Sequence, residues 1–172
     1  MSPLSRSSIK LAVLLGVLVV SPHSTQAGSA STALGVSASV ATICNIQTAS
    51  QAFPAAYDPI VANAASNLDD ATGSVTVACT KGTSPTIDLD LGQNASGTTR
   101  RMANGVGDFL SYEVFQDAGW TTVWGSGAGS NLAAGVAPSK APRSFTTYAR
   151  IPAAQDVPTG AYSDALTATV NF

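Results

Sequence analysis

The amino-acid sequence predicts an all-β sandwich, and three observations lead to this fold class. Apolar and polar residues alternate in several short segments, as expected for strands that are buried on one face. Glycine and proline cluster in the gaps between these segments, in stretches such as KGTSP, GQNASG and VPTG. No segment keeps a helical period, so we expect short strands packed as a sandwich.

The first 27 residues are predicted to be a signal peptide that is removed on export. Arg6 and Lys10 give a positive start, the apolar run LAVLLGVLVV occupies residues 11–20, and the small-residue pattern STQA ends at Ala27. Cleavage after Ala30 is the second choice. The apolar run is shorter than the roughly 20 residues that cross a bilayer, so a membrane anchor is the less favoured alternative.

The chain left after cleavage has the size of one ordinary domain and is weakly acidic. Without Arg6 and Lys10, six Lys and Arg residues remain against ten Asp and Glu residues, a net charge of about −4. This balance offers no electrostatic footprint for nucleic acid. The scarcity of charge and the abundance of small residues suit a sheet protein that meets other proteins.

The two cysteines, Cys44 and Cys79, are predicted to form a disulfide bond because export places them in an oxidising compartment. The bond would close a loop of about 35 residues, for which the chain-entropy model gives roughly 3 to 4 kcal/mol. A reactive thiol or a metal ligand is less favoured, because neither cysteine has a nearby partner for that chemistry.

The strands expected between the two ends of the chain all show alternation. The inward-facing side chains of the central strands are expected to be Val75, Val77, Cys79, Ile87, Leu89, Leu91, Leu110, Tyr112 and Val114. Asp88 and Asp90 are expected to face water. The predicted strands, in chain order, are residues 32–43, 73–80, 85–92, 109–117, 119–125, 144–152 and 160–172.

The first and last predicted strands carry the clearest alternation. In residues 32–43 one face carries Leu34, Val36, Ala38 and Val40, and in residues 160–172 one face carries Tyr162, Leu166, Ala168, Val170 and Phe172. The polar residues Ser163, Thr167, Thr169 and Asn171 occupy the other face of the last strand. No partner strand follows it in the sequence, although its free edge needs hydrogen bonds and its apolar face needs cover. The sequence therefore raises the question of what pairs with it.

Catalytic chemistry has little support in the sequence. The single histidine, His23, lies in the segment predicted to be removed, which excludes a Ser-His-Asp triad and a histidine metal site from the mature chain. The carboxylates of Asp69, Asp70, Asp88 and Asp90 could serve a glycosidase, but surface charge is the favoured interpretation. Asp88 and Asp90 also lack the ligand density of a calcium loop. We expect no enzyme, no metal site and no cofactor.

Two tryptophans offer an alternative function. Trp120 and Trp124 are four residues apart in a predicted strand, which places them on one face. They could form a platform for stacking sugars, although packing in a core or an interface is favoured.

Several stretches, read in order, resemble one protein family. They are FPAAYDP (53–59), TGSVTVACTKG (72–82), RRMANGVGDFLSYEVFQD (100–117), VWG (123–125), YARIPAAQDVPTGAYSD (148–164) and LTATVNF (166–172). Together they resemble the spore coat protein U domain family, which includes the subunits of archaic, Csu-type chaperone-usher pili. The resemblance covers roughly residues 32–172.

This resemblance implies an incomplete immunoglobulin-like sandwich that lacks its last strand and is completed by a donor strand. In the family a periplasmic chaperone first lends a strand, and the N-terminal segment of the next subunit then replaces it by β-strand addition. The implied organisation is a signal peptide (1–27), a donor-strand segment (28–43) and a pilin body (44–172). The implied donor residues are Leu34, Val36, Ala38 and Val40, and the implied acceptor-groove residues are Leu166, Ala168, Val170 and Phe172.

The resemblance also implies a function. The protein is expected to be a shaft or adaptor subunit of a surface pilus, exported through the periplasm, with a role in adhesion and biofilm formation. Its expected partners are neighbouring pilin subunits in a homo- or hetero-polymer, a periplasmic chaperone and an outer-membrane usher. The alternatives are a self-complemented spore-coat or surface matrix protein, a carbohydrate-binding module and, least favoured, an exported hydrolase.

Overall fold

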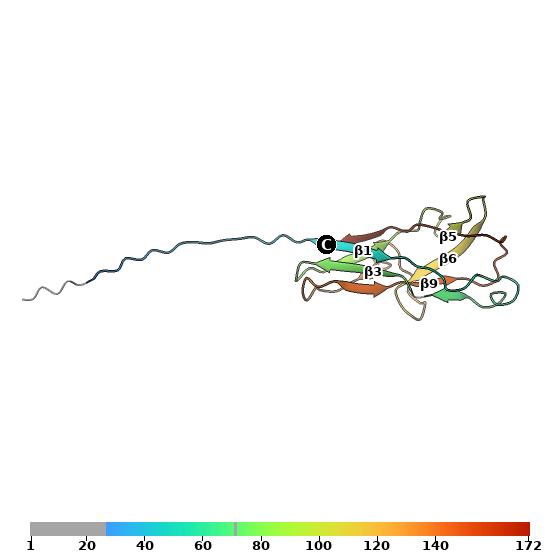
Figure 1. Cartoon of the computed structure of the whole chain (residues 1–172), viewed down its shortest axis with the longest axis horizontal. Coiled ribbons are helices and arrows are strands. Elements are labelled where there is room, and N and C mark those ends of the chain that lie inside the picture. Colours follow the sequence, from blue (N-terminus) through green and yellow to red (C-terminus); the bar gives the residue numbers. More distant parts are fainter. Residues whose placement is uncertain (1–26, 71) are drawn as a thin grey trace, which may run out of the picture. The chain divides into compact units, whose positions relative to one another are not determined.

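The structure, a computed structural model, describes residues 27–70 and 72–172. The predicted signal peptide lies outside the described residues apart from Ala27. The chain divides into two units, residues 1–38 and residues 39–172, and each is described by itself. The second unit is called the body below (Figure 1).

The described residues of the first unit contain no helix or strand, and the same holds up to Ile43. The strand predicted at residues 32–43 is therefore absent from this chain. Its side chains are exposed, because Leu34 and Val36 each keep 88% of their surface. The alternation predicted a strand, but a strand forms only where a second edge supplies hydrogen bonds.

The body consists of short antiparallel strands. Their bounds are β1 (Cys44–Ala49), β2 (Leu68–Asp70), β3 (Ser74–Cys79), β4 (Thr86–Leu89), β5 (Arg100–Ala103), β6 (Phe109–Phe115), β7 (Leu132–Ala133), β8 (Arg143–Thr146), β9 (Tyr148–Ile151) and β10 (Ala168–Asn171). They form three sheets with the orders β1-β3-β8, β10-β4-β7 and β2-β9-β6-β5. The all-β prediction is confirmed, since the described residues contain no helix.

Alternation predicted the central strands well and the marginal ones poorly. The strands expected at 73–80, 85–92, 109–117 and 160–172 correspond to β3, β4, β6 and β10, and the one at 144–152 is divided at Thr147 into β8 and β9. The strand expected at 119–125 is wrong, because this stretch is a loop that touches β6 through one bridge, Phe115 to Val123. The short or polar strands β1, β2, β5 and β7 carried no clear pattern.

All three sheets contribute to one core. Its buried members are Val75, Val77, Ile87, Leu89, Leu110, Tyr112, Val114, Trp124, Ala134, Ala149 and Ile151. The predicted inward side chains are thus confirmed, apart from Leu91, which lies beyond the end of β4 and is exposed. Asp88 and Asp90, expected to face water, are half-buried.

The core also holds one arginine. Arg100 in β5 is fully buried and forms an ion pair with Glu113 of β6. Its guanidinium donates hydrogen bonds to the carbonyl oxygens of Asp90 (2.6 Å) and Trp124 (2.7 Å). A buried charge needs such partners, and here they connect β4, β5 and the loop after β6.

Candidate functional site

The candidate site is a groove between β1 and β10, and the C-terminal segment forms one wall of it. Tyr162, Leu166, Ala168 and Val170 are half-buried, whereas Ser163, Thr167, Thr169 and Asn171 are exposed. The predicted faces of this segment are thus confirmed except at Phe172, which was expected on the apolar face and is exposed. Only Ala168–Asn171 forms a continuous ladder, in which β10 pairs with β4.

In β10 and the residue before it, the backbone N–H and C=O groups form hydrogen bonds along one edge only. The Thr167 carbonyl accepts a hydrogen bond from the Asp90 N–H (3.1 Å), and the Thr167 N–H donates to Asp90 Oδ1 (2.9 Å). Thr169 continues this edge opposite Asp88. Because backbone groups alternate between the two edges of a strand, those of Leu166, Ala168 and Val170 point the other way. No described strand pairs with β10 on that edge.

β1 forms the opposite wall and has the same property. It pairs with β3 in a register that places Cys44 opposite Cys79 and Ile46 opposite Val77. The Ile43 carbonyl accepts a hydrogen bond from the Thr80 N–H (2.9 Å). The backbone N–H and C=O groups of the odd-numbered residues in this wall therefore point toward β3. The backbone groups of Ile46 and Thr48 therefore point to the other edge, on which no described strand pairs with β1.

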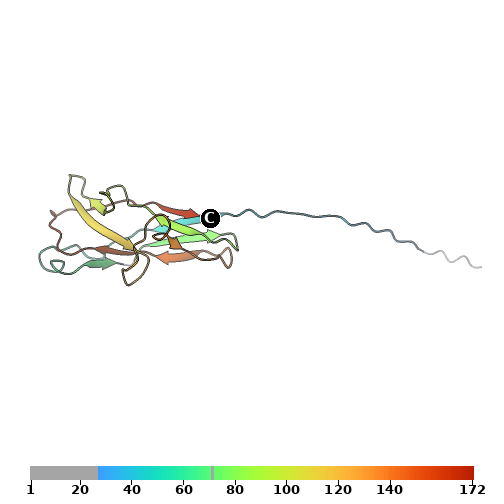
Figure 2. The ribbon, with the colours of Figure 1, turned by 180° about the vertical axis from the view of Figure 1, so that it is seen from behind.

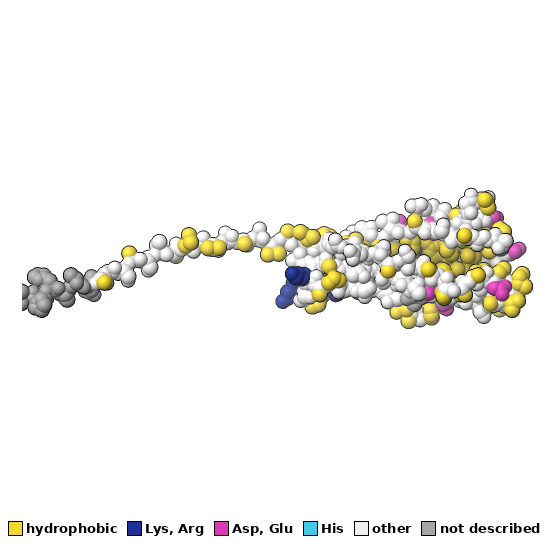
Figure 3. Space-filling view, viewed as in Figure 1, with side chains coloured by type: hydrophobic (Ala, Val, Ile, Leu, Met, Phe, Trp, Pro, Cys, Tyr) yellow, Lys and Arg dark blue, Asp and Glu magenta, His cyan; other side chains and the backbone are white. Residues whose placement is uncertain are grey.

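The space between these two walls is a groove of about 1050 Å³. Core side chains form its floor, and they include Val75, Leu89, Leu110, Tyr112, Val114 and Ile151. One wall runs through Thr48–Phe53 and the other through Val157–Leu166 and Ala168. Figure 3 shows a broad apolar area on this side of the body, where yellow side chains reach the surface.

The walls approach each other at one end. The end of β10 and the start of β1 lie side by side in both ribbon views (Figures 1 and 2), with Cα atoms of the two strands within 8 Å. Neighbouring strands in a sheet are about 4.8 Å apart, so a strand between two others needs about 9.6 Å. The groove is therefore open at the Tyr162 end and narrowed at the Cys44 end.

Asp164 fixes the C-terminal wall. Its Oδ1 accepts hydrogen bonds from the N–H groups of Gln93 (3.0 Å) and Asn94 (3.2 Å), and its Oδ2 accepts one from the Tyr112 hydroxyl (2.8 Å). A Cβ atom at Gly92, whose φ is +81°, would collide with this carboxylate. Burial, and then the bond to Asp164, raise the pKa of Tyr112, so the hydroxyl stays protonated as a donor.

A polar cluster fixes the other wall where it leaves β1. Gln51 accepts a hydrogen bond from the Thr147 hydroxyl (2.6 Å) and donates one to Asp70. Asp70 also accepts from the Thr72 hydroxyl (2.7 Å). Asp70 and Thr147 are buried, so these bonds hold the wall against β2 and the β8–β9 junction. Sequence reasoning did not identify this wall, because residues 48–58 show no alternation.

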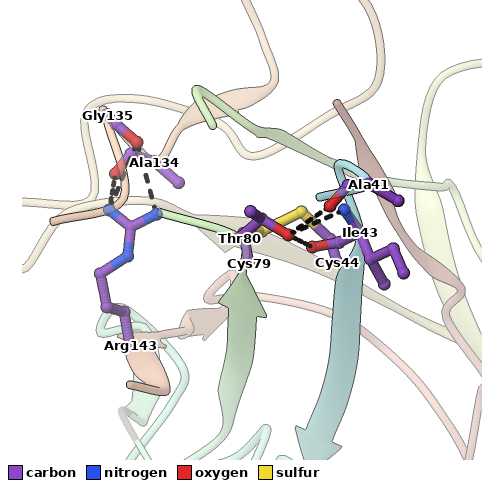
Figure 4. Close-up of a disulfide and its surroundings, with 8 residues drawn as sticks. All are labelled: Ala41, Ile43, Cys44, Cys79, Thr80, Ala134, Gly135 and Arg143. Carbon is purple, nitrogen blue, oxygen red and sulfur yellow. Dashed lines mark hydrogen bonds between the residues drawn. A yellow bond between two sulfur atoms is a disulfide. The ribbon is translucent and has the colours of Figure 1, made fainter. Parts of the chain in front are cut away.

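The disulfide bond between Cys44 and Cys79 is confirmed and lies at the narrow end of the groove (Figure 4). The residues just before it are bonded to Thr80, whose hydroxyl donates to the Ala41 carbonyl (3.0 Å) and accepts from the Ile43 N–H (3.1 Å). The entry of the chain into β1 is thus fixed from two sides.

The structure places the predicted site residues as follows. Leu166 and Ala168 line the groove. Val170 packs against the core without lining the groove, and Phe172 follows β10 and is 60% exposed. Val40, which belongs to the same unit as the groove, is 85% exposed.

The sugar-stacking platform is wrong. Trp124 is fully buried, and its Nε1 donates a hydrogen bond to the Ile87 carbonyl (2.9 Å). Trp120 lies in the turn before it at a φ of +50°, against Tyr148 and Arg150. The two rings share no exposed face because residues 119–125 are a loop.

Two of the carboxylates considered for catalysis, Asp69 and Asp70, have structural partners. Asp69 forms an ion pair with Arg150, and Asp70 belongs to the polar cluster beside β1. Across residues 27–70 and 72–172, no cluster of acidic, His or Cys side chains is suited to hold a metal ion. The same residues contain no helix long and apolar enough to cross a membrane.

Fold and groove together define a β-domain with two unpaired strand edges facing each other across exposed core. The Spore Coat Protein U domain model matches residues 30–169, and the chain belongs to this family. It is 35% identical over 127 residues to Protein U of Myxococcus xanthus, a match that covers 67% of this chain and 68% of that protein.

Solved structures show a similar fold. The body resembles a chain of the CsuC-CsuE chaperone-tip adhesion subunit pre-assembly complex from archaic chaperone-usher Csu pili of Acinetobacter baumannii, with a TM-score of 0.56 and 19% identity. The match covers 77% of this chain and 40% of that chain, so the protein spans about two fifths of its length. The Escherichia coli Hda pilus minor tip subunit HdaB gives a TM-score of 0.40 at 12% identity, covering 73% of this chain and 78% of that one.

Proposed function

We propose that the protein is a structural subunit, shaft or adaptor, of a chaperone-usher surface fibre, with no catalytic role. The observation that carries this proposal is the groove, in which two unpaired strand edges flank a floor of core side chains. A strand of another chain would satisfy both edges and cover the floor. The family membership and the likeness to a chaperone-subunit complex of a pilus support it.

The donor in this proposal is residues 28–43 of the next subunit. Leu34, Val36, Ala38 and Val40 would face the groove floor, and the intervening glycine and serine residues would face water. Leu34, Val36 and Val40 are highly exposed in the single chain and so are free to be buried. Residues 44–172, the part of the body that begins with β1, would receive the donor.

Apolar burial and new hydrogen bonds oppose the cost of ordering the donor segment. Burying Leu34, Val36 and Val40 contributes roughly 1.5 to 3 kcal/mol each. New main-chain hydrogen bonds add about 1 kcal/mol each, and ordering the segment costs about 1 to 2 kcal/mol per residue. A donor that fills the whole groove must also separate β1 from β10 at the Cys44 end, where the present spacing is too small for a strand.

The partners follow from the same need. Before assembly the exposed groove is an aggregation hazard, so a periplasmic chaperone would cover it with its own strand. An outer-membrane usher would then pass the subunit to the cell surface. Adhesion and biofilm formation are the roles expected of such a fibre.

The test is a denaturing gel of surface material run without boiling and probed for this chain. We expect a ladder of multimers that collapses to one band on boiling. A single monomer band in both lanes would instead indicate a self-contained domain and reject the fibre subunit.

Two matched variants assign the donor. Val36→Asp with Val40→Asp places charges on the face that enters an apolar groove, so the ladder should disappear while the body stays folded. Ser37→Asp with Ser39→Asp places the same charges on the other face and should preserve the ladder. Equal ladders from the two variants would reject this donor assignment.

A further inference from the structure

The exposed charges of the body are separated toward its two ends. On the face shown in Figure 3, dark blue Lys and Arg side chains gather at one end, and magenta Asp and Glu side chains lie toward the other. Two of the basic side chains between the ends are paired, since Arg100 contacts Glu113 and Arg150 contacts Asp69. A third, Arg101, lies over the Phe109 ring and donates a hydrogen bond to the Asn94 carbonyl (3.0 Å). Exposed lysines at one end and exposed carboxylates at the other remain available to a partner.

The basic end is defined by Lys81, Lys140 and Arg143. Lys81 lies in the turn after β3, Lys140 lies in the loop before β8, and both are exposed. The N–H of Gly82 donates to the Ala137 carbonyl (2.9 Å), which joins this turn and loop. Neither the stretch 80–85 nor the stretch 134–143 contains an acidic residue.

The acidic end is defined by Asp58, Asp108 and Asp156. The Asp58 carboxylate accepts hydrogen bonds from the N–H groups of Ile60 (2.9 Å) and Val61 (3.1 Å), which holds this loop in a tight turn. The turn leaves both apolar side chains about four-fifths exposed, at 81% and 78%. Asp156 is exposed and lines a shallow hollow with Ile60. No Lys or Arg occurs in residues 50–66, 104–110 or 152–164. The nearby Arg101 lies over the Phe109 ring and donates a hydrogen bond to the Asn94 carbonyl.

The two ends are far apart on one body. From Arg143 the chain runs through β8 and β9 to Pro152, and these nine residue-to-residue steps span about 30 Å at 3.3 Å each. A contact between the basic end and the acidic end must therefore join two different copies.

The proposed fibre brings such ends together, and the inference rests on that proposed function. After Val40 only three residues precede Cys44, so a donor's body starts within about 13 Å of the groove that holds its segment. Ala41 and Ile43 are bonded to Thr80, so the segment leaves its own body directly beside Lys81. The basic end of the donor's body must therefore face an end of the acceptor body.

We propose that consecutive copies of this chain meet end to end, with Lys81 and Lys140 of one body against Asp58 and Asp156 of the next. Opposite charges attract across this contact, whereas two basic ends would repel each other. Ile60 and Val61 project from the acidic end and are covered in the contact. The exposed Val136 lies in the loop that belongs to the basic end and is the apolar surface they meet.

A cysteine pair tests the contact directly. In Lys81→Cys with Asp156→Cys, the two new thiols of one chain are too far apart to bond, because a disulfide needs Cα atoms within about 7 Å. We expect oxidised fibres of this variant to give a ladder that survives boiling without reductant and collapses with it. The matched control is Lys81→Cys with Thr146→Cys, whose second position is exposed in the middle of the body and should give no such ladder.

The outcomes separate this contact from donor-strand polymerisation. If the unboiled gel shows a ladder but oxidation adds no boiling-resistant bands above the control, the end-to-end contact is wrong and the fibre stands. If the wild-type chain shows no unboiled ladder, the fibre proposal itself is wrong.

Charge reversal provides a second test, which is needed if the cysteine variant fails to assemble. Lys81→Glu with Lys140→Glu should slow fibre growth at least about threefold at low salt, and the difference should vanish near 0.5 M salt, where charges are screened within a few ångströms. Adding Asp156→Lys reverses a charge of the other end and should restore part of the rate. A rate unchanged by the first reversal at low salt would overturn the contact.

Discussion

Residues 32–43 and residues 160–172 carry the same alternating pattern but have different structures. In the C-terminal segment the apolar face is half-buried, because β4 supplies hydrogen bonds on one edge and the core lies beneath it. In the N-terminal segment Leu34 and Val36 are 88% exposed, and no ladder forms. The difference teaches that alternation specifies what a strand can bury, whereas a partner edge decides whether it forms.

The largest expected effect concerns the disulfide bond, which lies where the exposed N-terminal segment enters β1. Replacing both Cys44 and Cys79 with Ser removes the bond that closes a loop of about 35 residues, so the body should lose about 3 to 4 kcal/mol of stability. Urea unfolding followed by tryptophan fluorescence measures this loss. Protease cleavage within residues 27–43 should not change, and slower cleavage would mean that this segment depends on the body.

A smaller effect separates two leucines with the same place in the pattern. In monomeric protein, Leu166→Ala should cost about 1 to 2 kcal/mol, since a half-buried side chain leaves the groove wall. Leu34→Ala in the same protein should change stability by less than about 0.5 kcal/mol. Urea midpoints compare the two variants, and similar losses would show that Leu34 is packed in solution.

The smallest expected effect is on how the stability of the body depends on pH. The N-terminal segment cannot contribute to this dependence, because residues 27–43 contain no ionisable side chain. Hydrogen bonds from the Thr122 N–H and from Thr121 hold the pKa of Asp117 below its usual value of 3.8. A lowered folded-state pKa stabilises the body above the unfolded pKa, and this stability is lost as pH falls through the folded pKa. Asp117→Asn should therefore reduce the loss of stability between about pH 5 and pH 2. If urea unfolding shows the same loss of stability with falling pH in the variant and the wild type, the hydrogen bonds to Asp117 contribute nothing to the pH dependence.

The sequence identified those features of the fold that depend on local pattern. β3, β4 and β6 were predicted because residues such as Val77, Ile87 and Val114 are buried on a two-residue period. Cys44 and Cys79 were paired correctly, and they are the only two cysteines in the sequence. Of the four residues predicted for the acceptor groove, Leu166 and Ala168 line the groove, whereas Val170 and Phe172 do not.

Features that depend on non-local contacts were missed. β1 is polar beyond Ile46 because one edge and one face of it are uncovered, so its sequence resembles a loop. Gln51 holds the groove wall through Asp70 and Thr147, which are distant in sequence. Trp120 and Trp124 were placed in one strand because their spacing is even, but a turn separates them. Period alone does not reveal any of these contacts.

The position of the disulfide bond has a mechanical consequence. A pull along the proposed fibre would enter each body through residues 41–43 and reach Cys44 first. The covalent link to Cys79 transfers this tension at once to β3, which is hydrogen-bonded on both sides by β1 and β8. The edge strand β1 therefore cannot be peeled away from its first residue. A subunit stretched from its N-terminal side would resist force as a sheet loaded in shear.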